Sequence, residues 1–278
     1  MNSQLFNQSD NPHHDHPSAN QALFLKAHRR HHHIVSLSRF LLITVFLGLW
    51  ELAARREWID VFFFSSPWSI VTYLYQMLLD HSFFTHTGIT LLETIVSFLL
   101  VTLLSLLAAT LLWYVSGLAE VLEPYLVILN SLPKSALAPL LIVWLGTGTT
   151  TIIVAGISVA IFGSVINLYT GFCQADAEML KLIYTLGGNR KDAFIKVILP
   201  SSVPLILSNM KVNIGLSLVG VIIGEFLAAR RGLGYLIIYG SQVFQLNMVI
   251  TSIIILCAIA MAFYKLIQSM EHHYRKKY

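Results

Sequence analysis

Six long apolar segments, separated by more polar connections, dominate the 278-residue chain. Each comes close to or exceeds the roughly 20 residues that a helix needs to cross the hydrocarbon core of a bilayer. Pro133 and Pro139 interrupt the third segment. None of the segments alternates as a membrane barrel strand does, so the pattern predicts an all-α membrane protein with six transmembrane helices. The predicted spans are residues 37–54, 88–115, 125–145, 150–172, 204–228 and 248–267.

Composition agrees with a membrane location. Apolar residues make up 56% of the chain, and Asp, Glu, Lys and Arg together make up 12%. That charged share is about half that of a soluble domain, which excludes a soluble enzyme and a disordered chain. The two cysteines, Cys173 and Cys257, lie far apart and neither belongs to a CxxC motif. We therefore expect neither a disulfide nor a metal-binding pair.

The distribution of basic residues predicts the orientation of the spans. Arg55, Arg56, Arg230 and Arg231 lie on one predicted face of the membrane, and eleven basic residues lie on the other. By the positive-inside rule the face with eleven is cytoplasmic, so both termini are predicted to be cytoplasmic. The membrane itself is predicted to be the cell (inner or plasma) membrane. The eleven residues are Lys26, Arg29, Arg30, Arg39, Lys181, Arg190, Lys191, Lys196, Arg275, Lys276 and Lys277.

The connection between the first two spans is expected to contain a short helix. Ser66 is a typical helix cap and Pro67 suits the first helical position. Residues 68–79 then carry apolar side chains on one face. This pattern predicts an amphipathic helix in the outer interface of the membrane.

Residues 1–36 are predicted to form a polar, histidine-rich cytoplasmic tail. Residues 37–278 would form the membrane domain, with its core at 85–270. No apolar run follows the first basic residues at once, as it would in a secretory signal. The segment 29–33 has two interpretations, a metal-binding run or a solvated tail that keeps the first span's end inside. We assign no function to it.

Motifs of enzymes are missing from the sequence. It has no Gly-Lys pair of a phosphate-binding loop, no HExxH and no GxSxG, and the predicted spans hold no histidine. We therefore expect no catalytic residues, no metal site and no nucleic-acid partner in this chain.

The longest cytoplasmic connection, residues 173–200, has helical patterns of its own. Met179, Leu182, Ile183 and Leu186 follow helical spacing, and the pair at 187–188 then breaks the helix. Asn189 can cap a second short helix, which Pro200 is expected to limit. Loops in compact proteins usually run about 4–6 residues, so a connection of this length with two helices predicts a docking surface for a partner.

Here the sequence resembles a known family. Gly187 is followed by nine residues and then by Val197-Ile198-Leu199-Pro200, similar to the Gly, nine residues, Ile-x-Leu-Pro pattern of binding-protein-dependent ABC transporter permeases. Lys181-Leu182-Ile183 replaces the family's Glu-Ala-Ala. Residues 132–148, 224–226 and 232–236 resemble the nitrate, sulfonate and taurine branch of these permeases in the expected order.

The resemblance implies a six-helix type I ABC importer permease. Two copies would form the pathway, two cytoplasmic ABC ATPase subunits would dock beneath, and an extracytoplasmic binding protein would deliver a small nutrient for alternating-access import. ATP and Mg would bind the ATPase subunits, so this chain would hold no cofactor. The residues that would form the ATPase-coupling loop are Lys181, Leu182, Ile183, Leu186, Gly187, Gly188, Arg190, Leu199 and Pro200.

Five polar residues in or near the spans are candidates for the pathway or its gate. Lys134 could hold an anionic substrate, or could bond carbonyl groups freed by the nearby prolines. Glu225 could close an outer gate or meet the binding protein, or could pair with Arg230 or Arg231. Asn167, Asn213 and Ser217 belong to stripes of small and polar residues, which either pack helices closely or line a pathway.

Two other classes of function remain in competition. A stand-alone ion-coupled carrier would need ionisable residues deep in several spans and usually an internal repeat, whereas this chain offers mainly Lys134. A membrane-bound enzyme would need ligands and nucleophiles that the motifs do not supply. The sequence leaves the substrate open.

Overall fold

The computed structural model describes residues 19–277, with side chains for residue 35 and residues 37–272. It divides into two units, and the first contains helix α1 (Ala19–Arg55). The proposed tail of residues 1–36 therefore lies almost wholly outside the described side chains, although its backbone from Ala19 onward belongs to α1. Residues 37–55 of this helix are apolar and long enough to span a membrane.

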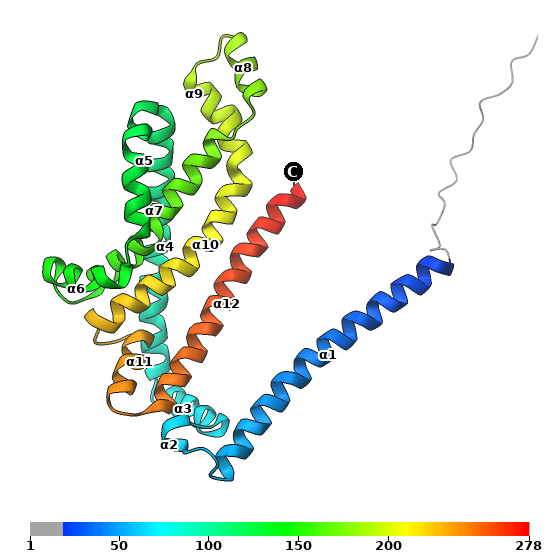
Figure 1. Cartoon of the computed structure of the whole chain (residues 1–278), viewed down its shortest axis with the longest axis vertical. Coiled ribbons are helices and arrows are strands. Elements are labelled where there is room, and N and C mark those ends of the chain that lie inside the picture. The colour runs from blue at the N-terminus through cyan, green and yellow to red at the C-terminus, as the bar shows by residue number, and fades with distance from the viewer. Residues whose placement is uncertain (1–18, 278) are drawn as a thin grey trace, which may run out of the picture. The chain divides into compact units, whose positions relative to one another are not determined.

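The second unit, residues 59–278, contains the remaining helices (Figure 1). Four long helices, α4 (Ser82–Tyr114), α7 (Thr149–Cys173), α10 (Leu199–Ala228) and α12 (Leu246–Lys277), form its bundle. Among the described residues, five helices are long and apolar enough to span a membrane, and the number is six when a bent pair of helices counts as one span. The all-α fold with six spans is confirmed.

The short helices lie at the two ends of this unit. Helices α2 (Val61–Phe64), α3 (Pro67–Leu79) and α11 (Leu233–Gln242) are at one end, and α8 (Ala177–Thr185) and α9 (Arg190–Ala193) are at the other (Figure 1). The predicted start of α3 is confirmed, because the Ser66 side chain accepts a hydrogen bond from the Ser69 N–H and Pro67 occupies the first turn.

The third predicted span is a broken pair of helices and not one continuous segment. Helix α5 (Ser116–Ser131) begins well before the predicted start, and α6 (Lys134–Leu145) leaves it at an angle of 97°. The cause is Pro133, because the residue before a proline is driven out of helical conformation. Leu132 accordingly has an extended backbone, with φ −64° and ψ 139°.

Pro200 does not limit the second coupling helix, contrary to prediction. Helix α9 continues through a π-helical turn, Phe194–Ile198, directly into α10. The Leu199 N–H bonds the Phe194 carbonyl across this wider turn. A wider turn accommodates a proline that lacks an N–H, so Pro200 and Pro204 stand inside a continuous helical segment.

Close packing at glycines joins α7 to α10. A Cβ added to Gly220 would lie 2.7 Å from the Gly156 Cα and 2.8 Å from the Ala155 carbonyl oxygen. A Cβ on Gly224 would lie 2.9 Å from the Ile152 Cα. At these glycines the small-residue stripes therefore serve close helix packing, as small-xxx-small patterns do in membranes.

Gly220→Val should push α7 and α10 apart and lower the free energy of unfolding by about 1–3 kcal/mol, as overpacking does. Unfolding of the purified chain in mixed micelles measures the change. Gly88→Val is the matched control, because a Cβ at Gly88 meets nothing within 4 Å. Equal losses in the two variants would contradict the packing role of Gly220.

Candidate functional site

The Glu225 carboxyl group is fully buried at the end of α10 next to α11. Its Oε1 accepts a hydrogen bond from the Thr90 hydroxyl at 2.6 Å, and its Oε2 accepts one from the Gly234 N–H at 2.5 Å. The Thr90 Oγ1 in turn accepts the Leu233 N–H at 2.9 Å. The N-terminus of a helix favours a negative group, so this carboxyl group ties α4, α10 and the start of α11 together.

Glycines make this approach to α11 possible. A Cβ on Gly234 would lie 2.8 Å from the Glu225 Oε2, and one on Gly232 would overlap the same carboxyl group. Gly232 also has a φ of +119°, which side chains rarely adopt. The Gly232-Leu233-Gly234 sequence is therefore a cradle for the Glu225 carboxyl group.

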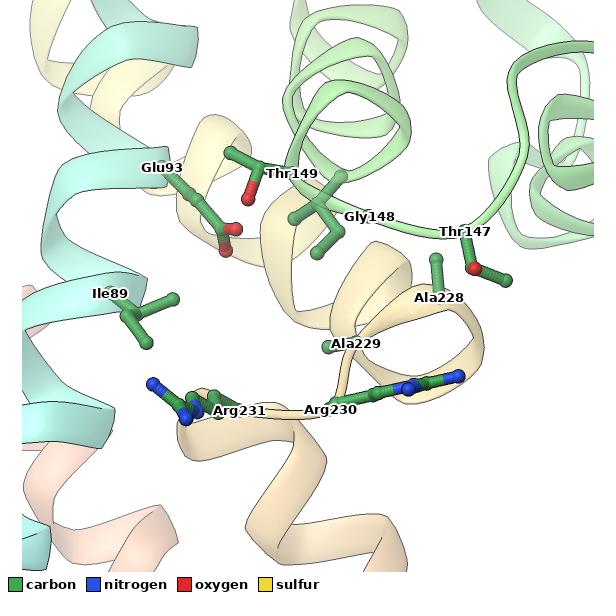
Figure 2. Close-up of a pocket in the computed structure, with 10 residues that line it drawn as sticks. Ile89, Glu93, Thr147, Gly148, Thr149, Ala228, Ala229, Arg230 and Arg231 are labelled. Carbon is green, nitrogen blue, oxygen red and sulfur yellow. The ribbon is translucent and has the colours of Figure 1, made fainter.

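The ion pair between Glu225 and Arg230 or Arg231 is wrong as a description of this structure. The carboxyl oxygens of Glu225 are bonded to Thr90 and Gly234, and both arginines are exposed on the turn between α10 and α11. Their side chains extend in opposite directions from that turn (Figure 2).

A pocket of about 320 Å³ opens beside this network. Glu93 of α4 lines it, is only 1% exposed, and has an Oε2 without a hydrogen-bond partner in the described part of the chain. Figure 2 shows the Glu93 carboxyl group pointing toward Thr149 and Gly148. We name this cavity the outer pocket; its lining residues are Ile89, Glu93, Thr147, Gly148, Thr149, Ile152, Ala228, Ala229, Arg230 and Arg231.

The outer pocket combines both signs of charge. Arg230 and Arg231 line its rim, and α7 begins there at Thr149 without a side-chain cap. Arginines and an uncapped helix N-terminus attract an anionic group, whereas a buried carboxyl group with one unpartnered oxygen favours a cationic or hydrogen-bond-donating group. The pocket can therefore hold a small molecule that carries a negative end, a positive end, or both.

A second polar cluster joins the middle of α4, α7 and α10. The Ser164 hydroxyl donates to the Ser105 Oγ at 2.8 Å and accepts from the Asn209 and Asn213 amides at 2.6 and 2.9 Å. The Asn167 amide donates to the Asn209 Oδ1 at 3.0 Å. We name these five residues the serine–asparagine network. It unites the predicted pathway residues Asn167 and Asn213, of which Asn167 is exposed.

Ser217 lies one turn beyond Asn213 on α10. It is fully buried, and its hydroxyl has no hydrogen-bond partner among the described residues. Ser217 is therefore buried in the helix packing and forms no hydrogen bond to the serine–asparagine network.

Lys134 begins α6 at the break between α5 and α6. Its ammonium group donates hydrogen bonds to the Leu129 and Asn130 carbonyls and lies 5.5 Å from the centre of the Phe162 ring. These carbonyls belong to the last turn of α5, which lacks helical partners and carries negative partial charge. The contacts match the second of the two predicted roles, which is the satisfaction of carbonyl groups at the proline break.

The predicted glycine bend in the cytoplasmic connection is a complete helix stop. The Gly188 N–H bonds the Ile183 carbonyl at 2.9 Å, and the Gly187 N–H bonds the Tyr184 carbonyl at 3.1 Å. Gly187 has a φ of +81°. This pair of bonds is the Schellman motif, whose left-handed residue is usually glycine. Asn189 then caps α9 with a capping box to Asp192, as predicted.

The side chains of this connection divide into two sets. Leu182 and Leu186 are 52% and 75% exposed, as is the neighbouring Met179 at 52%, and they leave an apolar face on α8 uncovered. Arg190 instead faces the bundle, because its guanidinium donates to the Trp113 carbonyl at 2.8 Å and lies over the Trp113 ring. Lys181, Leu199 and Pro200 are also at least partly exposed.

Sequence reasoning missed three residues of the spans. Helix α4 begins at Ser82 and so includes His86, whose Nδ1 accepts the Gly232 N–H at 3.0 Å. Glu93 in α4 and Lys211 in α10 are ionisable as well, so Lys134 is not the main charge within the spans. A carboxylate in an apolar span was the available signal for Glu93.

The comparisons with known proteins identify the family. The model described as "Binding-protein-dependent transport system inner membrane component" matches residues 101–273. The chain belongs to this family. A protein of Haemophilus influenzae named as an ABC transporter permease is 29% identical over 240 residues, covering 86% of this chain and 96% of the relative.

Two further relatives have names that include a substrate. The formylaminopyrimidine transport permease ThiX of Halalkalibacterium halodurans is 27% identical over 200 residues, with 72% of this chain and 79% of the relative covered. A Bacillus subtilis protein named as an aliphatic sulfonates transport permease, SsuC, is 27% identical over 219 residues, with 79% of each covered. The second relative supports the predicted sulfonate and taurine branch.

A solved structure shares the fold. A chain from a crystal form of the MetNI methionine ABC transporter, titled as inward facing, superposes with a TM-score of 0.60 at 16% identity. The match covers 68% of this permease and 94% of that chain. Membership of this family makes the permease a multi-pass inner-membrane subunit without ATPase activity. The family assignment excludes the two alternatives, an ion-coupled carrier and a membrane-bound enzyme.

Thr90→Val should lower the free energy of unfolding by about 2 kcal/mol or more, because the Glu225 Oε1 and the Leu233 N–H each lose the hydrogen bond to the Thr90 hydroxyl. Unfolding in mixed micelles measures the loss. Thr87→Val is the matched control, since the Thr87 hydroxyl is buried on the same helix and has no partner among the described residues. If both variants are as stable as the wild type, Thr90 does not join α4 to α11.

Gly187→Ala should raise the conformational free energy of the bend by about 1–2 kcal/mol, because alanine disfavours the left-handed backbone at this position. The bend then distorts while the spans stay inserted, and less ATPase subunit should co-purify with the permease. Gly117→Ala is the control, because the φ of Gly117 is not positive and a Cβ there would meet nothing within 4 Å. Full ATPase recovery with Gly187→Ala would show that the bend does not position a docking surface.

Proposed function

We propose that this permease imports a small sulfonate-, taurine- or nitrate-like nutrient, and that the outer pocket receives it. One observation carries the choice of site. The buried Glu93 carboxyl group has an oxygen without a partner and faces the same 320 Å³ cavity as two exposed arginines. A pocket with a few convergent polar groups is where a small ligand is expected to bind.

Among these nutrients, the charges in the outer pocket favour a zwitterion such as an aminoalkyl sulfonate. Its sulfonate would bind Arg230, Arg231 and the N-terminus of α7. Its ammonium group would bind the Glu93 carboxyl group. A simple anion has no positive group that could make this contact. Orientation supports this role, because the positive-inside rule puts the two arginines on the extracytoplasmic side, where a binding protein delivers substrate.

Transport in this family depends on partners, an extracytoplasmic binding protein and ATPase subunits. We propose that two copies of the permease form the pathway and that an ATPase docks on each cytoplasmic connection. The exposed side chains of Met179, Leu182 and Leu186 on α8 would bind it. ATP and Mg would bind the ATPase and not this chain. The serine–asparagine network lies between the outer pocket and this end, where a pathway would pass.

Substitutions of Glu93 and Arg231 test the substrate class. In proteoliposomes containing the permease, its ATPase and its binding protein, Glu93→Gln should reduce uptake of an aminoalkyl sulfonate by roughly tenfold, the value of one buried charged hydrogen bond. Uptake of an alkyl sulfonate without the amino group should change little. Arg231→Gln should reduce uptake of both.

Arg56→Gln is a control for charge, since Arg56 is an exposed basic residue outside the outer pocket. Equal loss of both substrates in Glu93→Gln would contradict a contact with the ammonium group. Wild-type uptake of both substrates in both variants would show that the outer pocket does not receive the substrate.

A further inference from the structure

A larger cavity lies between α10 and α12. Its volume is about 550 Å³, and its walls are mostly aliphatic and aromatic. A Cβ added to Gly215, in one of these walls, would meet nothing within 4 Å, so the wall is open there. We name this cavity the α10–α12 groove; its lining residues are Lys211, Ile214, Gly215, Leu218, Ala260, Met261, Phe263, Tyr264 and Lys265.

Two lysines stand at one end of the α10–α12 groove, and they are not equivalent. The Lys211 ammonium group pairs with the Glu271 carboxylate of α12. Lys265 is exposed and has no ion-pair partner among the described residues. Its neighbour Tyr264 is also exposed and presents an aromatic ring with a polar tip, which suits the membrane interface. The groove therefore has an apolar body and one end with an uncompensated positive charge.

The lengths of the helices give the depth of this end. Lys211 precedes the end of α10 at Ala228 by about 25 Å, and Lys265 follows the start of α12 at Leu246 by about 28 Å, at 1.5 Å per residue. Ala228 and Leu246 are the ends of α10 and α12 that lie on the predicted outer side. The hydrocarbon core is about 30 Å thick, so the two lysines lie near the cytoplasmic interface.

The apolar part of the groove extends from the lysines toward the middle of the membrane. Ile214 and Leu218 follow Lys211 in the outward direction along α10. Ala260 and Met261 precede Lys265, and so also lie outward of it, along α12. A phospholipid of the cytoplasmic leaflet has the same polarity, with its phosphate at the interface and its acyl chains directed inward to the midplane.

We propose that the α10–α12 groove binds an anionic phospholipid of the cytoplasmic leaflet. One acyl chain lies along Gly215, Leu218 and Met261, and the phosphate group binds the Lys265 ammonium group. The groove alone would accept the chain of any lipid, and Lys265 selects a headgroup with net negative charge. Basic pockets between transmembrane helices on the cytoplasmic side have this specificity. The occupant holds α10, which carries Glu225, against α12.

Native mass spectrometry of the full-length chain, released from nanodiscs with equal phosphatidylglycerol and phosphatidylcholine, tests the proposal. The wild type should retain phosphatidylglycerol in preference. Lys265→Gln should reduce that preference about fivefold, as expected for one basic residue at the interface. Gly215→Leu should fill the groove and remove both lipids.

Two matched variants control for charge and bulk. Arg56→Gln removes one basic residue at the predicted outer face, and Gly88→Leu adds the same side chain where a Cβ meets nothing within 4 Å. Both should retain phosphatidylglycerol as the wild type does, and retention in Gly215→Leu should fall well below that in Gly88→Leu.

Two results would overturn the proposal. One is equal retention of the two lipids by the wild type, or unchanged preference in Lys265→Gln. The other is a disulfide between cysteines introduced at Gly215 and at Leu42 of α1, in a chain without Cys173 and Cys257, because the protein itself would then fill the groove.

Discussion

A carboxyl group with no access to water must find its donors within the protein, and Glu225 finds them in two other helices. The donors are the Thr90 hydroxyl and the Gly234 N–H, so α4 and the start of α11 must meet α10 at this point. The requirement explains the glycines at 232 and 234, because any side chain there would displace the carboxyl group. It also forces the tight turn that leaves Arg230 and Arg231 exposed beside the outer pocket.

Close contact between α7 and α10 determines what the middle of the bundle can hold. Gly156 and Gly220 bring the two backbones so near that Ser164 reaches the amides of Asn209 and Asn213. A polar side chain in a membrane costs free energy when its hydrogen bonds are not made, and here the Ser164 hydroxyl alone bonds three other members of the network. The same contact thus supplies both helix packing and a polar strip between the two ends of the permease.

One continuous helical segment links the end of the cytoplasmic connection to the edge of the outer pocket. From Arg190 the chain runs through the π-helical turn and α10 to Ala228 without a break, and Glu225 lies in its last turns. Arg190 fixes the start of this segment on Trp113 of α4. A force that the proposed ATPase applied at α9 would therefore reach the outer end of α10 along one continuous helical segment.

Local signals in the sequence determined much of this protein. Apolar runs located the spans, and Ser66, Gly187 and Asn189 marked helix ends correctly, because caps and helix stops depend on neighbours within a few residues. The prediction that a helix ends at Pro200 is wrong, because the π-helical turn before this residue allows the helix to continue. Only the tertiary structure decided the 97° angle between α5 and α6, the partners of Glu225 and the burial of an unpartnered Glu93 oxygen beside a pocket. Thr90 lies 135 residues from Glu225 in sequence, and no local pattern specifies which side chains such distant segments bring together.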